Sequence, residues 1–268
     1  MGIAADILDP TAEGWRAALA ALEWHYEVGV TDFIGESPLN RYDLPEKAES
    51  SVPMVKADKS PVIAPAARPQ MDVTVEATRL AGAATSIDAL YETLLAFDRC
   101  ELKRGARNTI FAQGNPTARV MVLGDAPRRV EDLAGLPFQG PEGTLFDRMF
   151  AAIGLSRDTP DPARALYLAS ALPWPTPLDR DPSAQELALL APFVHRHIEL
   201  ASPEFIVVMG NAACQMVLQT SGIQRLRGQW GTALGIPVLP MLSPRWLLKH
   251  PAAKREAWAD LLSLKARL

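Results

Sequence analysis

Acidic and basic side chains gather directly after a short apolar run. Residues 119–123 read Arg-Val-Met-Val-Leu, a run typical of a buried strand in a parallel sheet. Residues 124–129 follow as Gly-Asp-Ala-Pro-Arg-Arg, and the acidic pair Glu131 and Asp132 comes next. Because parallel sheets place their sites at the carboxyl ends of the strands, we expect any chemistry of this chain to lie on this turn.

A glycine-rich segment, residues 135–143, continues the same loop. Its three glycines let the backbone approach a ligand, and Phe138 offers a flat face on which a planar ring could stack. The pattern fits equally well a set of turns around a core phenylalanine. The segment alone therefore leaves ligand binding and core packing open.

Alternating strands and helices must position these loops. An amphipathic helix through Leu90, Leu94 and Leu95 opens the pattern. Apolar runs then predict strands at 120–123, 166–169, 205–209 and 237–241, and helical spacing predicts helices at 145–153, 184–200, 212–219 and 253–265. Strands that alternate with helices indicate the α/β class, with a central parallel sheet covered on both faces.

Three parts are expected along the chain. Apolar spacing within residues 11–33 predicts a short amphipathic helix in an N-terminal helical segment, 1–44. Residues 45–85 are rich in proline and alanine and carry too little apolar surface to offset the entropy of ordering, so we expect a flexible linker. The α/β domain occupies 86–268. The N-terminal helix could bind a partner or pack on that domain, because an apolar stripe permits either.

Composition limits the cofactors and the location. Only two cysteines, Cys100 and Cys214, are present, which excludes a disulfide framework and a four-cysteine metal site and favours a reducing, cytoplasmic setting. His195 and His197 lie two residues apart on an expected helix, so they point to different sides and make a poor metal pair. We therefore expect no metal. The start of the chain does not resemble a secretion signal, and no stretch approaches the roughly 18 apolar residues of a membrane span.

Charge is unevenly distributed along the chain. The net charge is −4, but residues 1–88 carry 7 basic and 14 acidic side chains, whereas residues 89–268 carry 20 and 17. The mildly basic C-terminal part is compatible with a face that contacts phosphates, and it is equally compatible with an ordinary solvated surface.

Sequence blocks in residues 86–268 resemble, in order, those of the family 4 branch of the uracil-DNA glycosylase superfamily. The blocks are residues 100–102 with 107–108, 124–128 with 131–132, 135–140, 179–182 with Glu186, 202–212, 226–228 and 242–249. The resemblance implies a three-layer α/β sandwich. It also implies a base pocket and a surface for DNA.

The chain differs from family 4 at the positions that hold the family's cofactor. Family 4 enzymes hold a four-iron, four-sulfur cluster with four cysteine thiolates. Here only Cys100 remains, and the other three positions are Phe97, Trp174 and Leu190, which form a hydrophobic plug in this interpretation. We therefore expect no cluster and no other cofactor.

The resemblance also assigns roles at the pocket. Asp125 stands where the family has the glutamate that places the attacking water, and Ser170 replaces an asparagine that reads the base. Leu242 stands at the position of the histidine that stabilises the departing uracil, a donor worth about 2.7–4 kcal/mol. The implied base-binding residues are Gly124, Ala126, Pro127, Phe138 and Ser170.

A wedge that holds a flipped nucleotide out of the stack is expected after residue 242. Trp246, Leu247 and Leu248 have suitable apolar side chains, although a buried loop-to-helix junction would fit the same residues. The expected DNA contacts are Arg128, Arg129, Ser243, Arg245, Trp246, Leu247 and Lys249.

Two functions follow from these features. The favoured hypothesis is a catalytically degenerate protein, not an active enzyme, that serves as a binding or scaffold component in bacterial DNA replication or repair. It would resemble in role the psi subunit of the clamp loader, with the N-terminal helix docked onto a replication or repair protein. The alternative is an active, cluster-free glycosylase that removes uracil or another deaminated base from DNA.

Overall fold

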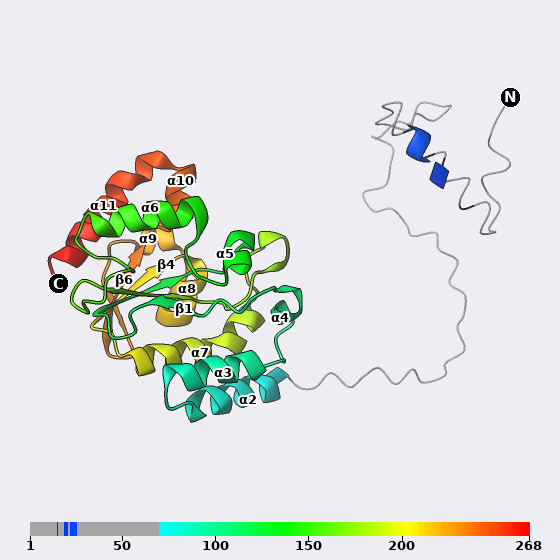
Figure 1. Ribbon diagram of the computed structural model, residues 1–268, viewed down its shortest axis with the longest axis horizontal. Helices are drawn as coiled ribbons and strands as arrows, with labels where there is room; N and C mark the ends of the chain where they lie inside the picture. The colour runs from blue at the N-terminus through cyan, green and yellow to red at the C-terminus, as the bar shows by residue number, and fades with distance from the viewer. Residues whose placement is uncertain (1–14, 16–18, 21, 26–69) are drawn as a thin grey trace, which may run out of the picture. The chain divides into compact units, whose positions relative to one another are not determined.

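The computed structural model describes residues 15, 19–20, 22–25 and 70–268 (Figure 1). The described residues of the N-terminal stretch are helical, as the spacing in 11–33 predicts, and the rest of that helix lies outside the described residues. Residues 45–69 of the expected linker also lie outside them.

Residues 70–268 form a six-stranded sheet with helices on both faces. The strands are β1 (Ala112–Gly114), β2 (Val120–Gly124), β3 (Leu166–Ser170), β4 (Phe205–Met209), β5 (Gly231–Ala233) and β6 (Ile236–Met241), in the order β1-β3-β2-β4-β6-β5. The four central strands are parallel, and the two short edge strands pair antiparallel with their neighbours. The fold class predicted from the sequence is confirmed.

Helices surround this sheet and complete three layers (Figure 1). They are α2 (Gln70–Ala83), α3 (Ile87–Ala96), α4 (Leu102–Gly105), α5 (Arg129–Ala134), α6 (Gly140–Ala151), α7 (Ala184–Ala201), α8 (Asn211–Leu218), α9 (Ile223–Leu226), α10 (Pro244–Lys249) and α11 (Lys254–Lys265), with short 3₁₀ turns η2 (Pro177–Asp179) and η3 (Pro251–Ala253). No helix in the described part of the chain is long and apolar enough to cross a membrane.

The two faces of the sheet are buried in separate apolar clusters. Alternate residues of β2 divide between them, with Met121 and Leu123 in one cluster and Val120 and Val122 in the other. The first cluster includes residues of α2, α3, α7 and α8, and the second includes residues of α6 and α11. Because both faces are covered, the central strands read as continuous apolar runs, which is why the sequence predicts them well.

The linker prediction is wrong for its last part. Residues 70–83 form α2, whose Ala77 and Ala81 are buried, and Ala84 directly after it is buried as well. Arg196 of α7 donates two hydrogen bonds, of 3.0 and 2.8 Å, to the carbonyl oxygen of Ala84. Packing against α7 therefore makes α2 part of the folded domain, which begins well before residue 86.

Candidate functional site

A small cavity lies where three neighbouring strands end. Gly124, the last residue of β2, pairs in register with Ser170 of β3 on one side and with Met209 of β4 on the other. The cavity has a volume of about 20 Å³. Its lining residues are Gly124, Asp125, Ala126, Glu131, Phe138, Glu142, Ser170, Met209, Ser243, Pro244 and Arg245. The implied base-binding residues other than Pro127 therefore line one cavity together with Asp125. Pro127 is buried, and neither it nor the expected DNA contacts Arg128 and Arg129 line this cavity.

Asp125 lies across the start of α8. Its Oδ1 accepts a hydrogen bond of 2.8 Å from the backbone amide of Ala212. Gly210 (φ 127°) makes room for it, because a Cβ at that position would lie 2.4 Å from the carboxylate carbon. Burial raises the pKa of Asp125, against the lowering effects of the Ala212 amide and Arg245. The carboxylate is thus a rigidly held proton acceptor, a suitable group for general-base chemistry.

Phe138 forms one wall of the cavity and also belongs to the core. Its ring packs at a centroid distance of 4.6 Å on Phe146, and only 8% of the residue is exposed. A Cβ on Gly124 would come within 2.8 Å of the Phe138 ring, so glycine is required there. Phe138 thus packs in the core and also lines the cavity, and its stacking of a ligand stays a prediction.

Glu131 was visible in the sequence only as half of an acidic pair. In the structure it holds the loop together: its carboxylate accepts hydrogen bonds from the backbone amides of Arg128 (2.9 Å) and Phe138 (2.7 Å). Burial raises its pKa. Its neighbour Asp132 points elsewhere and accepts hydrogen bonds from the Arg107 and Asn108 amides.

Arg245 reaches into the cavity from α10. Its Nε lies 3.1 Å from both carboxylate oxygens of Glu142, and its Nη2 lies 3.7 Å from Glu131. The sequence predicts Arg245 as a contact to DNA. In the structure its guanidinium forms ion pairs with the carboxylates of Glu142 and Glu131. Glu142 lies 103 positions away, so no local signal could reveal this pair.

Comparison with known proteins identifies the family. Residues 111–262 match the sequence model of the uracil DNA glycosylase superfamily. The chain belongs to this superfamily. It is 29% identical to the type-4 uracil-DNA glycosylase of Archaeoglobus fulgidus over 186 residues, which are 65% of this chain and 89% of that protein. It is 27% identical to the Thermotoga maritima type-4 enzyme over 154 residues, 56% of this chain and 77% of that one. A 139-residue match, 27% identical, lies in a DNA polymerase of Bacillus phage SP01 and covers 52% of this chain and 14% of the polymerase.

Leu242 does not lie at the cavity of this glycosylase-type fold. Its side chain is 2% exposed and packs in an apolar cluster with Leu247 and Ala257. The residue after it, Ser243, lines the cavity, and its Oγ accepts a hydrogen bond from the Trp246 amide at the start of α10. Leu242 thus does not line this cavity, and its correspondence to the family's histidine stays a prediction.

The expected wedge is not exposed as a unit. Leu247 is completely buried, so its prediction as a DNA contact is wrong: it lies on the inner side of α10. Trp246 is half-buried and packs on His250 at a centroid distance of 4.0 Å. Leu248 is 43% exposed, and Lys249 is exposed at the end of the helix.

The two arginines of the first loop differ in their surroundings. Arg128 pairs with Asp179, its Nη1 lying 3.5 Å from Oδ2, and its buried Nε has no hydrogen-bond partner among the described residues. Arg129 is exposed at the start of α5. Both lie on the sheet edge that carries the cavity.

The positions that the resemblance assigns to cluster ligands are buried. Phe97, Cys100, Trp174 and Leu190 are all buried in the same apolar cluster. Phe97 packs on Phe193 at a centroid distance of 5.1 Å. One thiol surrounded by aromatic and aliphatic groups does not fit an iron–sulfur cluster, which needs a ligand for each iron.

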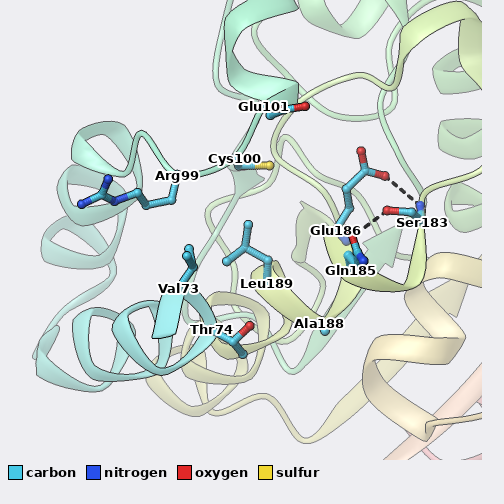
Figure 2. Close-up of a pocket in the computed structure, with 10 residues that line it drawn as sticks. All are labelled: Val73, Thr74, Arg99, Cys100, Glu101, Ser183, Gln185, Glu186, Ala188 and Leu189. Carbon is cyan, nitrogen blue, oxygen red and sulfur yellow. Dashed lines mark hydrogen bonds between the residues drawn. The ribbon is translucent and has the colours of Figure 1, made fainter. Parts of the chain in front are cut away.

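The largest cavity described is elsewhere. It has a volume of about 660 Å³ and lies between α2 and the start of α7, lined by Val73, Thr74, Arg99, Cys100, Glu101, Ser183, Gln185, Glu186, Ala188 and Leu189 (Figure 2). Burial raises the pKa of the Cys100 thiol, which makes it a poor nucleophile or ligand at neutral pH. This cavity contains none of the expected base-binding residues, so size alone does not identify the site.

The two helical histidines are structural in their surroundings. His197 is buried, its Nε2 lies 2.7 Å from the Tyr167 hydroxyl, and burial lowers its pKa to about 3. His195 Nε2 lies 2.8 Å from the carbonyl oxygen of Met216. Within residues 70–268 and the few described before them, no group of three or more His, Cys, Asp or Glu side chains could hold a metal ion.

Proposed function

We propose that this superfamily member binds DNA in a repair or replication complex and that its base-excision chemistry is reduced or lost. The observation that carries this proposal is the size of the cavity beside Asp125. About 20 Å³ leaves room for roughly one water molecule, whereas ligand pockets are typically about 300–1,000 Å³. A flipped base would have to displace Arg245 before it could enter.

The charge around Arg245 supports the same proposal. Cleavage of a glycosidic bond leaves negative charge on the base, and a well-placed donor stabilises it by about 2.7–4 kcal/mol. Arg245 is the cation nearest to Asp125 in the cavity lining, but Glu142 and Glu131 already neutralise it. We expect a correspondingly small stabilisation of a departing anion.

The N-terminal segment supplies the scaffold part of the proposal. Its described residues Trp15, Leu19, Leu22 and Trp24 are each at least half exposed on a helix. Trp15, Leu19 and Leu22 are spaced i, i+4 and i+7 and so share one side of this helix, whereas Trp24 lies on the opposite side. An apolar helix face of this kind suits the groove of a replication or repair protein. Deletion of residues 1–44 should abolish recovery of clamp-loader or repair proteins by the tagged chain while it leaves binding to oligonucleotides unchanged.

A second candidate, an active cluster-free glycosylase, is favoured by one observation: Asp125, Phe138 and Ser170 line the same cavity as a cation. In that case Asp125 accepts a proton from the water that attacks the sugar C1′, and the glycosidic bond breaks. Phe138 stacks the base, Ser170 contacts its edge, and Arg245 stabilises the anion before it is protonated.

One experiment separates the two functions. The full chain is incubated with single- and double-stranded oligonucleotides that contain uracil or hypoxanthine, and abasic sites are revealed by alkaline cleavage. Binding is followed by fluorescence anisotropy of the same oligonucleotides. The proposal predicts binding with little or no abasic product from the wild type.

Variants make the outcome specific. Abasic product at many turnovers, lost in Asp125→Asn and retained in Asp158→Asn, an exposed carboxylate outside the cavity, would establish the active glycosylase and overturn the proposed loss of catalysis. Absence of binding to every oligonucleotide would overturn the DNA-binding role itself.

A further inference from the structure

A groove lined mainly by apolar side chains lies between α6, α10 and α11 and has a volume of about 240 Å³. Its lining residues are Leu145, Arg148, Met149, Ala152, Leu247, Lys254, Ala257, Trp258 and Leu261. We call it the α6–α11 groove. These helices lie on the side of the sheet away from α2, α3 and α7 (Figure 1), and the groove shares no lining residue with the cavity beside Asp125. It is therefore a separate feature of the surface.

The floor of the groove belongs to the core, whereas its edge is exposed. Leu247, Ala257 and Leu261 are buried and form the floor. Trp258 lines the groove with 43% of its surface exposed, and Leu262, about one helical turn further along α11, is 45% exposed. Exposed apolar side chains that adjoin one another mark interaction sites, and tryptophan is enriched among the residues that contribute most to binding. The groove can therefore bury an apolar side chain of a partner.

The two charged residues of the lining are both cations. Arg148 of α6 and Lys254 at the start of α11 are exposed, and neither forms an ion pair with a residue that the structure describes. Among the described residues, none of those that line the groove is acidic. Two carboxylates of α11, those of Glu256 and Asp260, pair with Arg227 instead. The groove thus offers positive charge beside apolar surface, and a partner that carries negative charge beside an apolar group complements both.

We propose that the α6–α11 groove binds an acidic peptide segment of a partner protein. An aromatic or aliphatic side chain of that segment enters the groove beside Trp258, and its carboxylates pair with Arg148 and Lys254. The volume of about 240 Å³ is below the roughly 300–1,000 Å³ of pockets for small ligands, so it suits side chains of a bound segment better than a whole cofactor. The inference goes beyond the proposed function, because it requires neither DNA nor Asp125.

Single-stranded DNA is the other occupant to test. An exposed tryptophan next to cations could stack a base and contact a phosphate. A peptide fits better because the floor is aliphatic and recessed, and because two cations are fewer than a groove that follows a phosphate backbone would use.

The test measures the fluorescence anisotropy of a labelled peptide that is mixed with the full chain. The peptide consists of aspartates and glutamates with a phenylalanine at one end, and the wild type should bind it. Replacing the phenylalanine of the peptide by serine should weaken binding on the order of tenfold, because the groove then buries no apolar group. Replacing its acidic residues by the corresponding amides should weaken binding as well.

Variants of the chain locate the binding. Trp258→Ala and Lys254→Glu should each weaken binding of the acidic peptide on the order of tenfold. Both positions are exposed, so both variants should fold, and circular dichroism checks this. Lys265→Glu is the matched control, because it makes the same change of charge at an exposed position of α11 but lies at the other end of the helix, outside the groove. It should bind the peptide as the wild type does.

Several results would overturn the proposal. One is a wild type that does not bind the acidic peptide, and another is binding that neither Trp258→Ala nor Lys254→Glu weakens. Equal weakening by Lys254→Glu and Lys265→Glu would show general attraction to a charged surface. A single-stranded oligonucleotide that loses affinity in Trp258→Ala and Lys254→Glu, when the peptide does not, would assign the groove to nucleic acid. Formation of abasic sites is measured separately, so the proposed function can fail without this inference, and this inference without the proposed function.

Discussion

Arg245 Nε lies 3.1 Å from both carboxylate oxygens of Glu142, across the cavity at the carboxyl edge of the sheet. This pair joins α10 to the first turn of α6, and Arg245 also joins α10 to the first turn of α5 through Glu131. It therefore connects the elements that surround the cavity.

Removal of the cation should destabilise the protein in a pH-dependent way. In Arg245→Ala, Glu131 and Glu142 lose their shared partner, and we expect a loss of about 1–2 kcal/mol in the free energy of unfolding at pH 8. The loss should be smaller at pH 5, because burial already raises the pKa of Glu131 and a protonated carboxyl needs no cation. Urea denaturation at pH 5 and at pH 8 measures this loss.

Arg129→Ala, at an exposed position, is the control and should change the free energy of unfolding by less than about 0.5 kcal/mol. Equal losses in the two variants would show that the ion pairs of Arg245 contribute nothing to stability.

Asp125 should reduce stability when it ionises. Burial raises the pKa of Asp125 in the folded state. The protonated side chain therefore contributes to the free energy of unfolding fully below the unfolded pKa of 3.8, and this contribution is lost as pH rises through the folded pKa. Asp125→Asn keeps an oxygen for the Ala212 amide but carries no charge. The free energy of unfolding of Asp125→Asn, minus that of the wild type, should therefore increase as pH rises from 4 to 8. Urea denaturation at each pH measures this difference.

The Asp125→Ala variant separates charge from hydrogen bonding. It removes the acceptor for the Ala212 amide and should lose about 1 kcal/mol, as other helix starts do without their cap. If the Asp125→Asn and Asp125→Ala variants were equally stable at pH 7, the hydrogen bond from the Ala212 amide would contribute nothing to stability.

Gly210 should tolerate no side chain. In Gly210→Ala the new Cβ would lie 2.4 Å from the Asp125 carboxylate at a φ of 127°, and we expect a loss of about 2–4 kcal/mol from backbone strain and overpacking. Gly235→Ala is the matched control, with φ 77° and no atom within 4 Å of the added Cβ, and should lose only about 1 kcal/mol. Guanidinium denaturation of the two variants compares them; a similar loss in both would mean that Asp125 moves aside at little cost.

Leu178 should be replaceable by glycine with a gain in stability. Leu178→Gly removes the left-handed strain but adds freedom to the unfolded chain, for a net gain of about 0.5–1 kcal/mol. The same change at Leu95, which lies within α3 and is 36% exposed, should destabilise by about 1 kcal/mol. Thermal unfolding shows the sign directly, and a lower Tm for Leu178→Gly would indicate that the leucine side chain has a stabilising contact within the chain.

The central strands were predictable because their signal is local. Residues 205–209 form β4 as expected, and the other three predicted strands differ from β2, β3 and β6 by one residue at an end. The helix α2 was missed because its buried positions, Ala77 and Ala81, are small and resemble the alanine-rich linker before them. The three-residue strands β1 and β5 are too short for any periodicity to show, and only their neighbours define them.

The sequence by itself determined that the loops after β2 and β3 meet at one edge of a parallel sheet, because strand direction and order of elements fix where loops go. Only the tertiary structure decided where single side chains point. Arg245 turns inward to Glu142, Leu247 is buried and Leu178 is exposed. The reason is physical: the direction of a side chain depends on helical phase and on partners up to a hundred residues away, and neither is encoded in the neighbouring residues alone.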